Sequence, residues 1–174
     1  AFRWFERATE ADEPEIQDLF AKLLANASGG NEEALRKRNI DLVSNLSPDD
    51  ARFLAFVSDQ VAEFNQTAMA RYYSFVIKYD FIFTHRYKEA GFTNELPIDT
   101  MLALGVLRFE RDLKMDGHQI GHAISLATSE HVRGTDIGLS RMFEQEEKLV
   151  LTEVGKSLLT ALFPAQLIVT NLNQ

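Results

Sequence analysis

Helix-start signals recur along this sequence, and they constrain its fold more than any other feature. Three of the four prolines, Pro14, Pro48 and Pro97, stand where apolar residues at helical spacing begin. Proline is tolerated in the first turn of a helix because its missing N–H would have no partner there. The sequence therefore predicts a chain built mainly from short helices.

Apolar spacing predicts four helices in the first half of the chain. The first begins at Pro14 and ends at Ser28-Gly29-Gly30, and the second is capped by Asn31 and carries Leu35 on its apolar face. The third begins at Ser47, with Asp50 placed to form a capping box. A fourth helix is predicted over residues 66–78 from the spacing of Met69, Tyr72, Tyr73, Val76 and Ile77.

The second half changes in character after residue 92. Pro97 begins a short helix that Gly105 can end, and residues 106–114 alternate between apolar and polar side chains as a strand does. Residues 149–151 predict a short second strand, and Thr152 caps a final helix that Pro164 ends. The acidic run Glu144, Glu146 and Glu147 is interpreted as a solvated helix face.

We therefore expect a mainly α protein, with a helical bundle packed on a C-terminal winged-helix-like α+β unit. The bundle spans residues 1–92 and the unit spans residues 93–174, with an insertion at 115–148 and one shared core. Four of the nine glycines lie in that insertion. The aromatic residues between 53 and 83 are expected in the core, because few basic residues accompany them. A start at Ala1 followed by three aromatics suggests a piece of a longer chain.

Charge and cysteine content exclude several classes of function. The absence of cysteine rules out disulfide scaffolds, thiolate zinc sites and cysteine nucleophiles. A net charge of -8 disfavours nucleic acid and anionic membranes as partners, and residues from 96 onward carry 7 basic against 10 acidic side chains. No apolar run approaches the roughly 18 residues that span a bilayer.

Two sets of residues are the candidates for a site. Arg108, Arg111, Arg133 and Arg141 would carry nucleic-acid binding if they converged on one face. His118, His122 and His131 are the candidate metal ligands, because His118 and His122 are four residues apart and would share a helix face. Gln119 stands where a metalloprotease of this spacing needs its general-base glutamate, which argues against protease chemistry.

No nucleophile elbow and no glycine-rich phosphate-binding motif occurs in the sequence. We therefore assign no catalytic and no cofactor-binding residue, and expect a non-enzymatic domain without a cofactor.

Four stretches resemble the abortive-infection alpha (Abi-alpha) domain family of bacteria. Residues 15–27 and 42–54 resemble its front, where a helix with an "LLA-N/S" turn precedes an "LS-P-x-DA" helix start. Residues 102–107 resemble its "L-x-x-LG" turn, and residues 151–159 resemble its "LT-x-x-G" close. The last two patterns also occur in winged-helix regulators of the multiple-antibiotic-resistance type. The resemblance covers residues 12–163 except the insertion, with Phe20 where the family usually has Trp.

The resemblance implies a cytoplasmic bacterial protein linked to phage defence, and it implies no catalytic residues. Our leading hypothesis is a non-enzymatic interaction or regulatory domain that acts through an unidentified protein partner. Self-association through the aromatic-rich middle is compatible with that hypothesis. The alternatives are a winged-helix DNA-binding regulator and a metal-dependent hydrolase that uses the histidines of the insertion.

Overall fold

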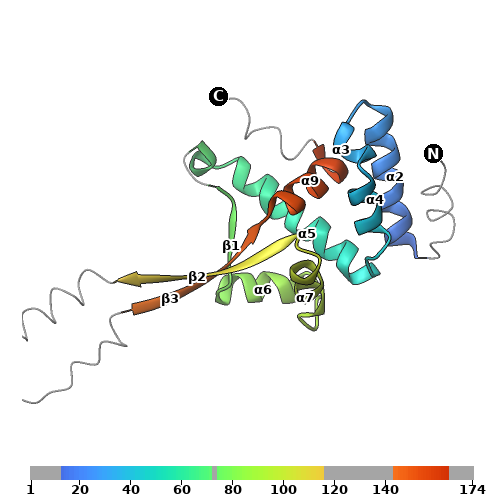
Figure 1. Ribbon diagram of the computed structural model, residues 1–174. Helices are drawn as coiled ribbons and strands as arrows, with labels where there is room; N and C mark the ends of the chain where they lie inside the picture. Colours follow the sequence, from blue (N-terminus) through green and yellow to red (C-terminus); the bar gives the residue numbers. More distant parts are fainter. Residues whose placement is uncertain (1–12, 72–73, 116–142, 165–174) are drawn as a thin grey trace, which may run out of the picture.

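The computed structural model describes residues 13–71, 74–115 and 143–164. This part of the chain is mainly helical, with seven α-helices and a three-stranded antiparallel sheet (Figure 1). In chain order its elements are α2 (Pro14–Ser28), α3 (Glu32–Leu35), α4 (Lys37–Val43), α5 (Pro48–Asn65), the 3-10 helix η1 (Ala68–Arg71), β1 (Val76–Lys78), α6 (Phe81–Glu89), α7 (Leu96–Ala103), β2 (Leu107–Met115), β3 (Phe143–Leu151) and α9 (Glu153–Leu162).

The helix starts predicted at Pro14 and Ser47 are confirmed. Pro14 is the first residue of α2, whose buried face carries Ile16, Leu19, Phe20 and Leu23. Ser47 caps α5: its side chain accepts from the Asp50 N–H, and the Asp50 carboxylate accepts from the Ser47 N–H at 2.9 Å. Both ends of this box are satisfied by local bonds, which explains why sequence alone located it.

The single helix predicted after Asn31 is wrong, because the chain bends at Arg36. Arg36 has extended backbone angles (φ -66°, ψ 122°) and separates α3 from α4. The bend lets both short helices contact α9, and it turns Leu35 outward, where its side chain is 61% exposed. Leu35 therefore does not belong to the apolar face that was predicted for it.

The helix predicted over residues 66–78 is also wrong. Its first part is the short η1, where Met69 is 63% exposed, and Tyr72 and Tyr73 lie outside the described residues. Its last part is the strand β1, which pairs with β3 through Val76↔Val150 and Ile77↔Leu149. A three-residue strand depends on its distant partner, so no local pattern could reveal it.

Helix α6 was not predicted at all. It begins after Asp80, whose carboxylate accepts from the Phe83 N–H at 2.9 Å. Of the aromatic residues expected in the core, Phe53 and Phe83 are buried, but Phe81 is 83% exposed on α6. The prediction of an aromatic core is therefore correct for the buried members and wrong for Phe81.

The two predicted strands form an antiparallel ribbon that projects from the helical body in Figure 1. β2 pairs with β3 from Leu107↔Leu151 to Met115↔Phe143, so β3 is longer than predicted. Glu144, Glu146 and Glu147 consequently lie in a strand, which corrects their interpretation as a helix face. The consecutive acids of β3 interrupt the alternation of apolar and polar residues that predicts a strand. The segment is nevertheless a strand, because pairing with β2 outweighs the low strand propensity of these residues.

Helix α9 joins the two parts of the chain. It contacts α2, α3, α4 and β3, and its residues Leu158, Leu159 and Leu162 are buried in the core. One continuous cluster of buried apolar side chains contains residues from both sides of position 92, from Ile16 to Leu162. The final helix therefore closes the core against the first three described helices.

Candidate functional site

Two of the four candidate arginines are described, and both are held by carboxylates on the β2–β3 ribbon. Arg108 forms an ion pair with Glu110 on its own strand, and Arg111 Nε donates to Glu147 Oε1 at 3.0 Å. Lys148 lies 3.8 Å from the same Glu110 carboxylate. Arg133 and Arg141 lie outside the described residues. The two described arginines thus belong to a ladder of alternating charges along the ribbon.

All three candidate metal-binding histidines, His118, His122 and His131, lie outside the described residues. Within the ranges that the structure describes, no group of three or more His, Asp and Glu side chains could hold a metal ion. His85, which is described, is exposed on α6 and lies 3.2 Å from Glu89. None of the helices in the described part of the chain is long and apolar enough to cross a bilayer.

The first turns of α6 and α7 each carry exposed apolar side chains. Phe81 is 83% exposed, Ile82 is 64% exposed and Leu96 is 66% exposed. The opposite faces of both helices are anchored in the core by Phe83, Tyr87, Ile98 and Met101. Helix α7 adds the exposed Asp99 and no basic residue. We call Phe81, Ile82, Glu95, Leu96 and Asp99 the α6–α7 face.

The starts of α6 and α7 are tied together by Tyr79. Its hydroxyl donates to Glu95 Oε1 at 2.5 Å, directly before α7 begins. Burial, together with the hydrogen bond to Glu95, raises the pKa of Tyr79. Beneath the face, burial and the nearby carboxylates raise the pKa of Tyr87 to about 12, and its hydroxyl donates to the Asn94 carbonyl at 2.7 Å.

An aromatic layer supports these two helices from below. The Tyr87 ring stacks on Phe92 with 4.5 Å between centroids, and Phe53 meets both rings edge-on at 5.8 Å. Such packed rings hold their geometry better than flexible aliphatic chains do. These ring contacts therefore pack α6 and the loop that follows it against α5.

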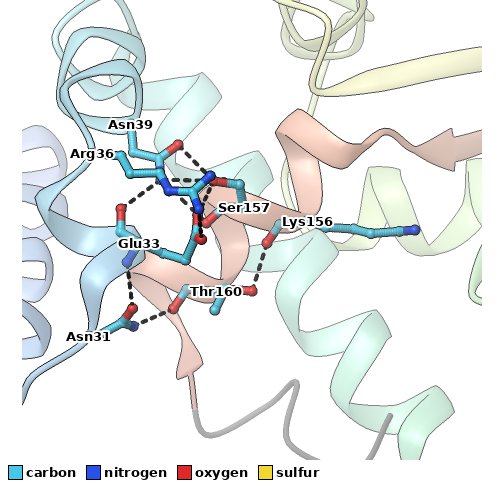
Figure 2. Close-up of polar contacts among 7 residues, drawn as sticks. All are labelled: Asn31, Glu33, Arg36, Asn39, Lys156, Ser157 and Thr160. Atoms are coloured by element: carbon cyan, nitrogen blue, oxygen red, sulfur yellow. Dashed lines mark hydrogen bonds and ion pairs between the residues drawn. The ribbon is translucent and has the colours of Figure 1, made fainter. Parts of the chain in front are cut away.

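A second cluster of polar side chains joins α3 and α4 to α9 (Figure 2). Asn39 is fully buried, and its amide donates to the Glu33 carbonyl at 2.8 Å and to Ser157 Oγ at 3.0 Å. The Ser157 hydroxyl donates to Glu33 Oε2 at 2.5 Å, and the same carboxylate accepts from Arg36 at 2.7 Å. No histidine takes part, so this serine has no general base of the usual kind.

Two further asparagines hold the C-terminal end of α9. Asn31 Nδ2 donates to the Thr160 carbonyl at 2.8 Å, and Asn26 Nδ2 donates to the Ala161 carbonyl at 2.8 Å. These carbonyls belong to the last turn of α9, where helix carbonyls lack partners within the helix. These hydrogen bonds therefore fix the end of α9 to α2 and to the start of α3.

The residues just before β2 and the start of α9 bring two of the quoted sequence patterns into contact. Thr152 donates from its hydroxyl to the carbonyls of Gly105 and Val106 and accepts from the Gly155 N–H at 3.1 Å. A side chain on Gly155 would place its Cβ 2.2 Å from the Val106 carbonyl oxygen. Gly105 has a positive φ of 69°, which glycine adopts readily. The glycines and the threonine are thus required by the fold itself.

A family model named abortive infection alpha matches residues 3–162, which is most of the chain. The chain belongs to the abortive infection alpha family. No curated protein and no solved structure matches it. The resemblance drawn from the sequence patterns is thereby confirmed. The patterns that carry it in this abortive infection alpha domain include Asn26, the Ser47 capping box, Gly105 and Thr152, all of which make structural contacts.

Sequence reasoning missed the α6–α7 face. A usable signal was present, because Asp80 is a good N-cap and the consecutive Phe81 and Ile82 occupy the first turn that follows it. Adjacent residues lie about 100° apart around a helix, and the buried Phe83 and Tyr87 define the inner side. The exposed position of Phe81 and Ile82 could have been inferred once α6 was recognised.

Proposed function

We propose that this abortive infection alpha domain is a non-enzymatic interaction domain in the bacterial cytoplasm. It acts in phage defence by binding a protein through the α6–α7 face. Family membership supports the defence setting. The elements α5, β1, α6, α7, β2 and β3 follow in the order of a winged-helix unit, with sheet order β1-β3-β2, which supports a winged-helix-like fold for this part.

The observation that carries the proposal is the exposure of three large apolar side chains on one helix pair. Phe81, Ile82 and Leu96 are each more than half exposed, and they stand at the starts of two helices linked by the Tyr79–Glu95 hydrogen bond. Exposed apolar side chains rimmed by polar residues are typical of protein contact surfaces. Aromatic anchors of this kind contribute most of the binding energy at many interfaces.

Charge favours a protein over DNA as the partner of this face. In a helix–turn–helix the second helix enters the major groove, and that position corresponds to α7 here. Helix α7 offers Asp99 and no cation, while the described arginines of the ribbon are held by Glu110 and Glu147. DNA binding gains most of its non-specific affinity from cations that neutralise phosphates. The first turns of α6 and α7 expose apolar side chains and Asp99 but no cation, which suits a protein surface better.

A capture experiment from phage-infected cells tests the proposal. Tagged wild-type protein is compared with the double variant Phe81→Asp/Ile82→Asp. Met69→Asp is the control because Met69, on η1, is 63% exposed, close to the 64% of Ile82. We expect a reproducible set of partner proteins with the wild type and the control, and its loss with the double variant. Equal recovery from all three proteins would overturn the proposal.

Duplex DNA binding at low salt separates this proposal from the DNA-binding alternative. We expect no measurable binding of random duplex by the purified protein. Binding that falls steeply with rising salt and weakens in Arg111→Ala would favour the winged-helix DNA regulator instead.

A further inference from the structure

A second surface of the molecule has a chemistry opposite to that of the α6–α7 face. It lies on α3 and α4, where Leu35 is 61% exposed and precedes Arg36-Lys37-Arg38, the only run of three basic residues in the sequence. A shallow hollow of about 370 Å³ lies along α4 and the residues after it, and it is lined by Lys37, Arg38, Asp41, Leu42 and Asn45. We call Leu35 and these five lining residues the α4 face.

The cations of the α4 face are available for a partner. Lys37 and Arg38 are exposed, and neither forms an ion pair with any other residue that the structure describes. Arg36 differs, because Glu33 holds it at 2.7 Å. Lys37 and Arg38 outnumber the one acid of the α4 face, Asp41, so this face carries a net positive charge beside the exposed Leu35 in a chain whose net charge is -8.

We infer that the α4 face of one copy binds the α6–α7 face of a second copy. Apolar side chains stand on both sides, Leu35 and Leu42 on one and Phe81, Ile82 and Leu96 on the other. Glu95 and Asp99 would face the cations Lys37 and Arg38, so the charges are complementary. The inference rests on the proposed function, since it names the partner of the same α6–α7 face.

A single copy cannot make this contact with itself. In Figure 1 α4 and α6 stand well apart, with α5 between them. The contact therefore joins two different surfaces of two copies. Two copies joined in this way still expose one unused α4 face and one unused α6–α7 face. Further copies can therefore add until a ring closes or a filament forms.

The first measurement is the mass of the purified full chain in solution over a range of concentrations. We expect a mass that rises above the 19.7 kDa of one chain with concentration and falls when sodium chloride is added, because salt screens exposed charges. A mass that stays at one chain at every concentration would overturn the inference.

Two charge-reversed variants make the test specific. Lys37→Glu/Arg38→Glu makes the α4 face acidic, and Asp99→Lys/Ala103→Lys makes the α6–α7 face basic, since Ala103 is exposed on the same helix. Each variant alone then sets like charges against each other and stays monomeric. Mixed together, the two variants offer opposite charges at both contacts, and we expect association to return.

The matched control is Lys156→Glu, an exposed charge reversal on α9 that lies on neither face. It should associate as the wild type does. If neither reversed variant reduces association, or if the mixture remains monomeric, the inference is wrong. If the wild type is monomeric while Phe81→Asp/Ile82→Asp still loses its partners in infected cells, the proposed function stands and the partner is a different protein.

Discussion

At the scale of single residues, the family patterns mark positions where the fold tolerates little change. Gly155 is the sharpest case, because a Cβ there would meet the Val106 carbonyl oxygen at 2.2 Å and a Leu151 methyl at 2.9 Å. Backbone cannot move aside as a flexible side chain can. Glycine is therefore present for close packing of α9 on the start of β2, and a catalytic role is not needed to explain it.

Gly155→Ala should consequently destabilise the protein, although alanine favours helices by about 1 kcal/mol over glycine. Overpacking of a close contact costs about 1–3 kcal/mol or more, so the net free energy of unfolding should fall. Urea denaturation measures this change. Gly29→Ala is the control, since its Cβ would meet only atoms at 3.4 Å and beyond. Equal stability of the two variants would refute the packing argument.

Asn39 is the residue that organises the polar cluster of Figure 2. Asn39→Ala removes the donor to the Glu33 carbonyl and to Ser157 Oγ and leaves these half-buried groups with one hydrogen-bond partner fewer. We expect a loss of about 1–3 kcal/mol in the free energy of unfolding. Asn45→Ala removes an exposed hydrogen bond from the Asn45 side-chain amide to the Asp41 carbonyl. This variant should change the free energy of unfolding by less than about 0.5 kcal/mol. A harmless Asn39→Ala would mean that the cluster does not fix α9.

Tyr87 makes stability depend on pH in the alkaline range. Its pKa is raised to about 12 in the folded protein, against 10.0 for an ordinary tyrosine, so the folded state holds this proton more tightly. The stabilisation is complete below pH 10 and is lost as the pH rises towards 12. Urea denaturation at several alkaline pH values should show a shallower decline for Tyr87→Phe, even if that variant starts from lower stability. The same slope in both proteins would contradict the assignment.

At the scale of elements, local signals located three helices that begin with their own caps, α3, α5 and α9. Ser47 and Asp50, Asn31 and Thr152 each make the hydrogen bonds that the sequence implied. Elements that depend on distant partners could not be found in this way. β1 exists because β3 pairs with it, and the bend at Arg36 exists because α3 and α4 both reach α9. The α6–α7 face was missed for a different reason, because α6 was not recognised although Asp80 provides a local cap for it.

The capping box provides the test at this scale. Ser47→Ala removes the acceptor for the Asp50 N–H and the hydroxyl that donates to the Asp50 carboxylate at 2.8 Å. Loss of such a cap costs about 0.5–2 kcal/mol, which thermal unfolding should report as a lower Tm. Ser28→Ala removes only a bond back to Leu24 within α2 and should leave the Tm almost unchanged. Equal Tm values for the two variants would show that the box contributes nothing.

At the scale of the whole molecule, the residues that stabilise the fold are different from those on the two exposed faces. The family patterns and the asparagine contacts bind the front of the chain to α9, while the α6–α7 face and the α4 face remain exposed. The histidine candidates His118, His122 and His131 lie outside the described residues, so they do not enter this division. The function proposed above therefore depends on these two exposed surfaces.

Phage plating on cells that carry the full-length protein tests this central claim most directly. The strains carry the wild type, a deletion, Phe81→Asp/Ile82→Asp, or Met69→Asp. Aspartate is suitable at both α6 positions because acidic residues are favourable in the first turn of a helix, and circular dichroism checks that the variants are folded. We predict that the double variant plates phage as the deletion does, while Met69→Asp protects as the wild type does. Full protection by a folded double variant would contradict the account.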